Sequence, residues 1–277
     1  MGVAVNSISQ PSRARRLPST HLALRRVNLR DAYAVWRRNL LVYLRMWRMH
    51  FFPQFADPFV SILAFGWGIG SLVAAEVGGV SYFAFVGAGV LTFGVVASAL
   101  FETTYGTYAR MSESVFEAIL VTPVEVESLA FGEICWSVTA ATFRGMIVLL
   151  VLTLFGAVSS PAALLAPLPL ATCSFFVSGI SLGVTAKVRN IYSFNLYTSA
   201  FFSLVLLCGV WFPLEVMPAT LQWVGWALPI TSAINVTRAL LTGRLSAGHI
   251  AEFLYLVVSA VVFTEWALRS MRRRMLE

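Results

Sequence analysis

Six long apolar runs alternate with short polar stretches along most of the chain. They occupy residues 55–75, 82–104, 130–156, 162–186, 192–212 and 249–268. Each is close to the about 20 residues that an α-helix needs to cross a bilayer. The pattern predicts an all-α integral membrane protein with six transmembrane helices, and we assign residues 53–277 to one transmembrane domain.

The region before the first run has a different pattern. Between Leu29 and Trp47, apolar residues recur at helical spacing beside a second face of arginines. Such a helix, with Trp and Tyr on its apolar face, is typical of the membrane interface. We therefore predict an amphipathic interface helix over residues 21–52, with packing on a soluble partner as the alternative. The polar residues 1–20 are predicted to be a disordered cytoplasmic tail.

The segment between the fifth and sixth runs, residues 213–248, is apolar but interrupted by Pro213, Pro218 and Pro229. Proline breaks a helix interior, so this segment cannot form a single span. It predicts an external re-entrant pair of short helices whose ends are shielded by protein. Gly243 is expected to end the second helix.

The basic residues between the runs predict the topology. The segment 105–129 carries Arg110, and the turn at 187–191 carries Lys187 and Arg189. The loops near 76–81 and 157–161 carry neither Lys nor Arg, and both ends of the chain are rich in Arg. Because cytoplasmic loops are enriched in Lys and Arg, both termini are predicted to be cytoplasmic in a multi-pass protein of a bacterial inner membrane. The external segment 213–248 departs from this rule with two arginines, Arg238 and Arg244.

Composition excludes several classes of function. Hydrophobic residues make up 58% of the 277 residues, charged residues 12%, and the net charge is +7. The basic residues flank apolar runs, which indicates contact with anionic membrane lipids and not with nucleic acid. Lys187, the only lysine, follows Ala186, so the chain has no Gly-Lys-Ser/Thr loop for binding ATP. The scattered Cys and His residues predict no metal site.

The stretch "SESVFEAILVTP" at 112–123 is the strongest candidate for a functional element. On a helix its apolar residues form one arc, with acidic residues beside it, and Pro123 ends it. Ser112 or Ser114 is expected to cap its start. A short amphipathic helix of this kind can insert into a groove on a soluble partner. The arc and the acidic edge consist of Val115, Phe116, Ile119 and Leu120, and of Glu113 and Glu117.

Six glutamates and Arg144 each allow two functional interpretations. The glutamates gather around this stretch without a neighbouring His, which favours a docking or solvated surface over a catalytic set. Arg144 lies inside the third run, where a charge is costly and often functional. It either contacts an anionic substrate or forms a structural ion pair with Glu102 or Glu133.

Several segments resemble the type-2 (ABC-2) permease subunits of ATP-binding-cassette exporters, over most of residues 30–275. Within that family the resemblance is greatest to the branch that exports the nodulation factor, a lipo-oligosaccharide. The segments are "ADPFVSILAFGWGIG" (56–70), "GVSYFAFVGAGV" (79–90), "FETTYGTYARM" (101–111), "FEAILVTPV" (116–124), "GEICW" (132–136), "GVWFPLEVMP" (209–218), "LPIT" (228–231) and "RALLTG" (238–243).

The resemblance implies a transport subunit without catalytic residues or cofactors of its own. It implies a homodimer bound to two copies of a separate ATPase, which binds ATP and Mg. It also implies that residues 112–123 are the coupling helix that sits in a cleft of that ATPase. The residues expected to make this contact are Glu113, Phe116, Glu117, Ile119, Leu120 and Pro123.

The resemblance further implies a substrate path at the dimer seam, lined by the first, second and fifth spans. Aromatic side chains there can stack on sugars or cover acyl chains, although most such residues simply pack in a core. The candidates are Tyr82, Phe83, Phe85, Phe93, Phe101, Tyr105, Tyr192, Phe194, Tyr197, Phe201 and Phe202, with Arg144. The expected cargo is an amphiphilic glycan or lipid-linked substrate. The alternatives are a drug or natural-product exporter of the same fold, an ion-coupled secondary transporter and a membrane-bound transferase.

Overall fold

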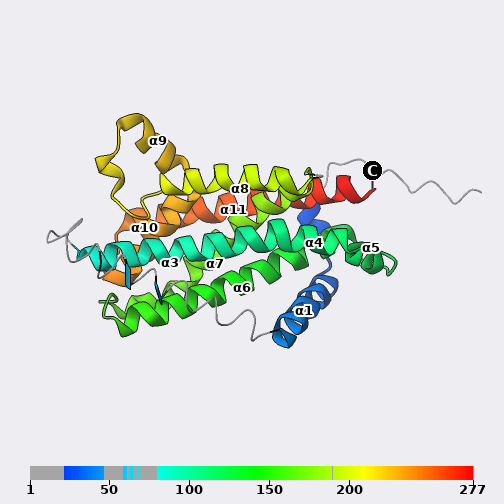
Figure 1. Cartoon of the computed structure of the whole chain (residues 1–277), viewed down its shortest axis with the longest axis horizontal. Helices are drawn as coiled ribbons and strands as arrows, with labels where there is room; N and C mark the ends of the chain where they lie inside the picture. Colours follow the sequence, from blue (N-terminus) through cyan, green and yellow to red (C-terminus); the bar gives the residue numbers. More distant parts are fainter. Residues whose placement is uncertain are drawn as a thin grey trace, which may run out of the picture.

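The computed structural model describes residues 22–46, 59–60, 63–64, 68, 80–188 and 190–276. Over these residues the secondary-structure elements are all helical. They form an elongated bundle with α5 at one end and α9 and α10 at the other (Figure 1). The prediction of an all-α protein is confirmed for this part of the chain.

Four of the described helices are long and apolar enough to cross a membrane. One continuous helix runs over Tyr82–Ser112 and comprises α3 (Tyr82–Phe101), η3 (Glu102–Gly106) and α4 (Thr107–Ser112). The others are α6 (Val126–Leu154), η4 with α7 (Pro161–Leu165 and Pro167–Thr185), and α11 (Ala247–Leu276). They match the predicted spans at 82–104, 130–156, 162–186 and 249–268.

The remaining two predicted spans have different outcomes. The run at 192–212 contains α8 (Ile191–Leu206), which has 16 residues, fewer than the about 20 of a full span. The helix is shorter than predicted because the chain turns at Gly209, where φ is 76°. The run at 55–75 lies outside the described residues except for isolated positions. The structure therefore supports four spans, and the total of six stays a prediction.

Helix α7 lies at the centre of the bundle and packs against α11, α6 and α3. Two glycines make the contact with α11 close. A Cβ atom at Gly179 would lie 2.9 Å from the backbone of Phe263, and one at Gly183 would lie 2.0 Å from the Trp266 ring. Small residues at such crossings let two helices approach closely. Close packing is important in a membrane, because lipid provides no hydrophobic driving force between helices.

The amphipathic segment forms a short 3-10 turn, η1 (Ala23–Arg26), followed by α1 (Leu29–Arg45). The Asn28 side chain caps α1 by accepting from the backbone N–H of Arg30 at 3.1 Å. Ala32 and Val35 are buried where α1 packs on α6. The opposite side carries exposed apolar side chains, namely Leu29, Tyr33, Leu41 and Leu44. The bundle therefore holds one side of α1, and the other is an exposed apolar surface.

Helices α1 and α6 are so close at Gly132 that one added methyl group is expected to destabilise the protein. A Cβ atom at Gly132 on α6 would lie 2.7 Å from the Ala32 carbonyl oxygen and 2.8 Å from Val35 Cβ. We expect Gly132→Ala to push α1 away and lower the free energy of unfolding by about 1–3 kcal/mol, the usual range for overpacking. The measurement is thermal unfolding in detergent. Gly94→Ala is the matched control, because nothing lies within 4 Å of a Cβ atom there. Equal unfolding of the two variants would contradict the prediction.

The segment 213–248 forms a 3-10 turn, η5 (Leu214–Val216), and two helices, α9 (Ala219–Ala227) and α10 (Pro229–Thr242). The breaks between them fall at the predicted prolines. Gly243 ends α10 with a left-handed φ of 74°, as predicted. The Tyr255 hydroxyl of α11 donates to the Ala227 carbonyl oxygen at 2.7 Å. The pair of helices is therefore tied to the start of α11.

Both described ends of the chain lie at the α5 end of the bundle. The backbone N–H groups of Ala23 and Leu24 donate to the Glu265 carboxylate near the end of α11, at 2.6 and 2.9 Å. Arg272 forms an ion pair with Glu127 in the first turn of α6. Figure 1 shows the C-terminus near α5. This end therefore contains α5, the first described residues and the arginines of α11.

Candidate functional site

The segment predicted to dock on a partner contains a shorter helix than expected, α5 (Val115–Leu120). Glu113 and Ser114 separate it from α4, and Ser114 has a left-handed φ of 56°. The predicted serine cap is wrong. The Ser112 hydroxyl donates to the Ala109 carbonyl oxygen at 2.9 Å, and the Ser114 side chain makes no capping hydrogen bond. The left-handed residue turns the chain instead, and Pro123 lies in the turn after the helix.

The residues of this segment divide into a buried and an exposed set. Phe116 is 1% exposed and packs with Leu129 and Met271 in a core between α5, α6 and α11. Ile119 and Leu120 are half-buried against the same core. A helix this short uses its apolar arc to attach to its own bundle, so Phe116 cannot contact a partner in this structure. The exposed surface, here called the α5 surface, consists of Glu113, Glu117, Val121 and Pro123.

A group of partly or fully buried polar side chains, here called the Arg110 cluster, lies next to the α5 segment. It consists of Arg110, Glu102, Glu133, Asn39 and Trp136. Arg110 Nη1 lies 3.0 Å from Glu102 Oε1, and Arg110 Nη2 lies 2.7 Å from Glu133 Oε2. The Glu133 side chain is fully buried. A buried carboxylate needs a compensating cation and hydrogen bonds, and Arg110 supplies the charge.

The rest of the cluster joins three helices. Asn39 Nδ2 of α1 donates to Glu133 Oε1 of α6 at 3.0 Å. Trp136 Nε1 of α6 donates to Glu102 Oε1 at 2.9 Å. Burial lowers the pKa of the neighbouring Arg38 guanidinium, while Glu133 raises it and Arg110 lowers it further. The Arg110 cluster therefore ties α1, the α3–α4 helix and α6 together.

A cavity of about 320 Å³ connects the cluster with the α5 segment. Its lining includes Arg38, Arg110 and Glu102 as well as Glu113 and Val115 of the α5 segment. A shift of α5 would therefore change the surroundings of the ion pairs directly. The arrangement provides a short physical link from an exposed acidic surface to a membrane-spanning helix.

The helix that carries Glu102 and Arg110 contains a π-helical turn, η3, over Glu102–Gly106. The Thr103 and Thr104 hydroxyls donate to the carbonyl oxygens four residues earlier, both at 2.6 Å. The Thr185 hydroxyl of α7 donates to the Thr103 carbonyl oxygen at 3.0 Å. Side-chain hydroxyls thus support the wide turn. Single π turns inside α-helices are frequently found at functional sites.

Sequence reasoning found the glutamates near this site but not their partner. Arg110 served only as evidence for topology, and Glu102 and Glu133 were assigned to Arg144 as possible partners. The structure pairs both carboxylates with Arg110 and places Arg144, half-buried, on α6. The charge of Arg110 beside a dense set of glutamates was the signal that could have identified the pair.

The predicted aromatic residues fall into separate groups. Phe101 and Tyr105 lie beside each other, with ring centroids 5.7 Å apart, and both contact α8. Phe101 lies 5.8 Å from Phe202, and Tyr105 lies 5.8 Å from Phe194. Phe93 extends the row along α3, with its ring 5.6 Å from that of Phe202. All five aromatic residues of this row are among the candidates predicted from the sequence.

Four further aromatic candidates lie outside the row. Tyr197 and Phe201 lie together on α8, and the Tyr197 hydroxyl is 3.1 Å from the Ser181 hydroxyl of α7. Tyr82 and Phe85 lie at the start of α3, at the end of the bundle far from α5. Phe101 is 46% exposed, whereas Phe201 is buried. The row therefore offers an exposed surface mainly at Phe101.

Comparison with known proteins agrees with this architecture. The family model described as "ABC-2 type transporter" matches residues 30–242. "Nodulation protein J" of Rhizobium meliloti (strain 1021) is 32% identical over 212 residues, covering 76% of this chain and 80% of that protein. The protein of the same name from Rhizobium leguminosarum bv. viciae is 30% identical over 246 residues, covering 87% and 95%. The resemblance stated from the sequence is confirmed, and the chain belongs to the ABC-2 type transporter family.

Proposed function

We propose that the chain is the membrane permease subunit of an ATP-driven exporter that moves an amphiphilic, lipid-linked oligosaccharide out of the cell. The observation that carries the proposal is the α5 surface joined to the Arg110 cluster, in a chain without an ATP-binding loop. A transport subunit of this kind needs a separate ATPase and a place to receive its movement. The names of the relatives, all "Nodulation protein J", favour a cargo of the nodulation-factor type.

The coupling mechanism follows from the arrangement of α5. ATP binding closes two copies of the ATPase, which bind ATP and Mg and contact the α5 surface through Glu113, Glu117, Val121 and Pro123. Because Phe116, Ile119 and Leu120 attach α5 to the bundle, α5 moves with the cores of α6 and α11. The Arg110 cluster transmits the movement to the α3–α4 helix and α1. Nucleotide shifts the equilibrium only by binding one conformation better than the other.

The substrate path runs along the aromatic row, where two copies of the chain meet as a homodimer. Helix α8 supports this assignment, since Tyr192 is 82% exposed and Leu196 is 76% exposed. An apolar face of this kind is covered by lipid or by a second copy. Phe101 and Tyr105 face the same region and can cover acyl chains or stack on sugar rings. The exposed face of α1 lies in the inner interface of the membrane, and both termini are cytoplasmic.

Reconstitution tests the proposal. The chain is purified from its native membrane, its associated ATPase is identified by mass spectrometry, and both are placed in proteoliposomes with lipids extracted from the same cells. We expect export of a bound lipid-linked oligosaccharide that requires ATP and persists when ion gradients are collapsed. Export driven by an ion gradient without ATP would support the secondary-transporter alternative and overturn the proposal.

A drug or natural-product exporter of the same fold is the second candidate function, favoured by the hydrophobic character of the aromatic row. The same proteoliposomes distinguish the two. Mass spectrometry of the co-purified small molecules identifies a glycolipid in the first case and a compound without sugar in the second.

A further inference from the structure

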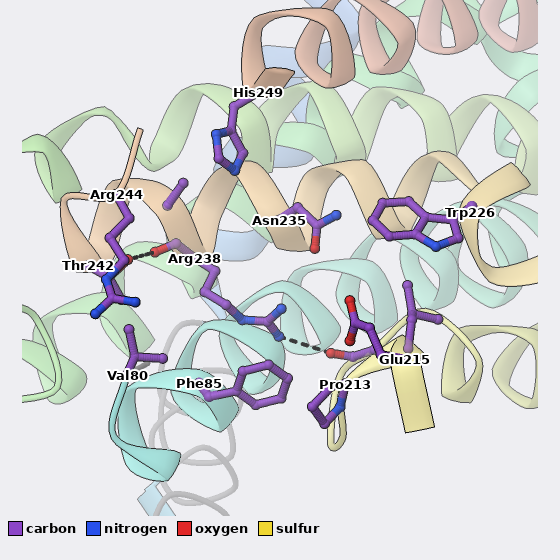
Figure 2. A pocket seen from close by; sticks show the side chains of 13 residues that line it. Val80, Phe85, Pro213, Glu215, Trp226, Asn235, Arg238, Thr242, Arg244 and His249 are labelled. Carbon is purple, nitrogen blue, oxygen red and sulfur yellow. Dashed lines mark hydrogen bonds between the residues drawn. The ribbon is translucent and has the colours of Figure 1, made fainter. Parts of the chain in front are cut away.

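A second cavity, of about 500 Å³, lies at the end of the bundle far from α5. It is open to one side and is lined by the start of α3, the loop before α9, the end of α9, α10 and the first turn of α11 (Figure 2). Ligand pockets typically have volumes of about 300–1,000 Å³, so this cavity can hold a group of the size of a sugar ring. If α5 faces the cytoplasm, the cavity opens on the outer side of the membrane.

Arg238 of α10 projects into the middle of this cavity (Figure 2). Its Nη2 donates to the Gly209 carbonyl oxygen at 2.9 Å, and its guanidinium lies 3.7 Å over the Phe85 ring. Among the described residues no carboxylate forms an ion pair with it, and its buried Nε has no hydrogen-bond partner. A guanidinium has five N–H donors and stays charged. The ring and one carbonyl group hold the side chain in place and leave donors for a ligand.

The walls add an aromatic face and further polar groups. Trp226 of α9 lies at the rim and is 46% exposed. Asn235 donates through Nδ2 to Glu252 at 3.2 Å, which leaves its carbonyl oxygen as an acceptor. His249 Nδ1 accepts from the Ser246 backbone N–H at 3.0 Å, so the neutral ring carries its proton on Nε2. Each of the three side chains lines the cavity.

This combination is suited to a sugar more than to the alternatives. An exposed indole offers a flat apolar face, and planar donors and acceptors around it match ring hydroxyls. A simple anion would need no aromatic wall, and the Glu215 carboxylate at the same cavity would repel it. A purely apolar compound would leave the Arg238 donors unsatisfied, which is costly in a buried site.

We propose that this cavity binds one sugar unit of the cargo's oligosaccharide head on the outer side of the membrane. Trp226 stacks on the sugar ring, and Arg238 and Asn235 hydrogen-bond to its hydroxyl groups. The site holds the head group after it has crossed, while the acyl portion is still in the membrane. This assignment rests on the proposed function, because it takes the cargo to be a lipid-linked oligosaccharide.

Binding of soluble probes tests the site without export. The full chain in lipid nanodiscs, which leave both faces accessible, is titrated calorimetrically with cellotetraose, N-acetylchitotetraose and inorganic phosphate. We expect a tetrasaccharide to bind and Trp226→Ala to weaken that binding about tenfold, because the aromatic face that contacts the sugar ring is lost. Trp223→Ala is the matched control, since Trp223 lies on the same helix, is 78% exposed and does not line the cavity.

Arg238→Gln is expected to weaken tetrasaccharide binding as well, and thermal unfolding shows whether the variant is folded. Absence of binding by both tetrasaccharides, or equal losses in Trp226→Ala and Trp223→Ala, overturns the proposal. Binding of phosphate alone overturns it in favour of an anion site. Association with the ATPase is measured in parallel: loss of association contradicts the proposed function, whereas intact association without sugar binding contradicts only this site.

Discussion

Replacing Arg110 with Met is expected to lower the free energy of unfolding by about 3–5 kcal/mol, the usual cost of removing one partner of a buried ion pair. The Glu133 carboxylate is fully buried and would lose the cation that lies 2.7 Å from it. Thermal unfolding of the purified chain in detergent measures the effect. It should appear as a lower unfolding temperature.

Two further variants make this prediction specific. Arg110→Met combined with Glu133→Gln should recover much of the loss, because a neutral amide needs no cation. Arg269→Met removes the more exposed partner of the Arg269–Glu265 pair, 2.7 Å apart, and should cost at most about 1 kcal/mol. If Arg110→Met and Arg269→Met unfold at the same temperature, the Arg110 cluster does not stabilise the bundle as described.

Placing a positive charge on the α5 surface is expected to uncouple ATP hydrolysis from export. Glu117 and Val121 are exposed, and Val121 is 88% exposed, so Glu117→Arg and Val121→Arg should leave the fold intact. Unfavourable charge at a protein interface costs several kcal/mol, so we expect export to fall by about tenfold or more. The measurement is ATP-dependent transport in proteoliposomes, together with co-purification of the ATPase.

The matched control lies at the other end of the bundle. Leu164 in η4 is 83% exposed, and Leu164→Arg changes the same kind of side chain away from α5. Ile119 and Leu120 are less suitable positions, because both pack on the chain's own core and a charge there would also weaken the bundle. Normal export and ATPase binding by Glu117→Arg and Val121→Arg would show that the ATPase docks elsewhere.

Much of the fold could be predicted because the bilayer imposes one length on every span. Four of the predicted apolar runs form long helices, and Gly243 ends α10 as expected, since its left-handed φ favours glycine. The span predicted at 192–212 was too long, because apolar residues continue past the turn at Gly209. Periodicity identifies which residues are apolar, but it cannot detect where an apolar chain changes direction.

The site was harder to predict, because it depends on contacts between residues far apart in the sequence. The position of α5 was found from its acidic edge, but not the burial of Phe116, which depends on Leu129 and Met271. The pairing of Glu133 with Arg110 links α6 to α4, and no spacing along one helix reveals it. The cavity at Arg238 was missed for the same reason, although Arg238 had been noted as an exception to the charge rule.

The π turn at Glu102–Gly106 sets how far the helix after the turn is rotated around its axis relative to the helix before it. A π turn holds about one residue more than an α turn. If the same residues closed as a regular α-helix, everything beyond the turn would rotate by about 100° around the axis. Arg110 would then point away from Glu133 although neither residue had changed. The width of this turn is therefore as strict a requirement as the identity of the charges, and a substitution that narrows the turn should separate Arg110 from Glu133.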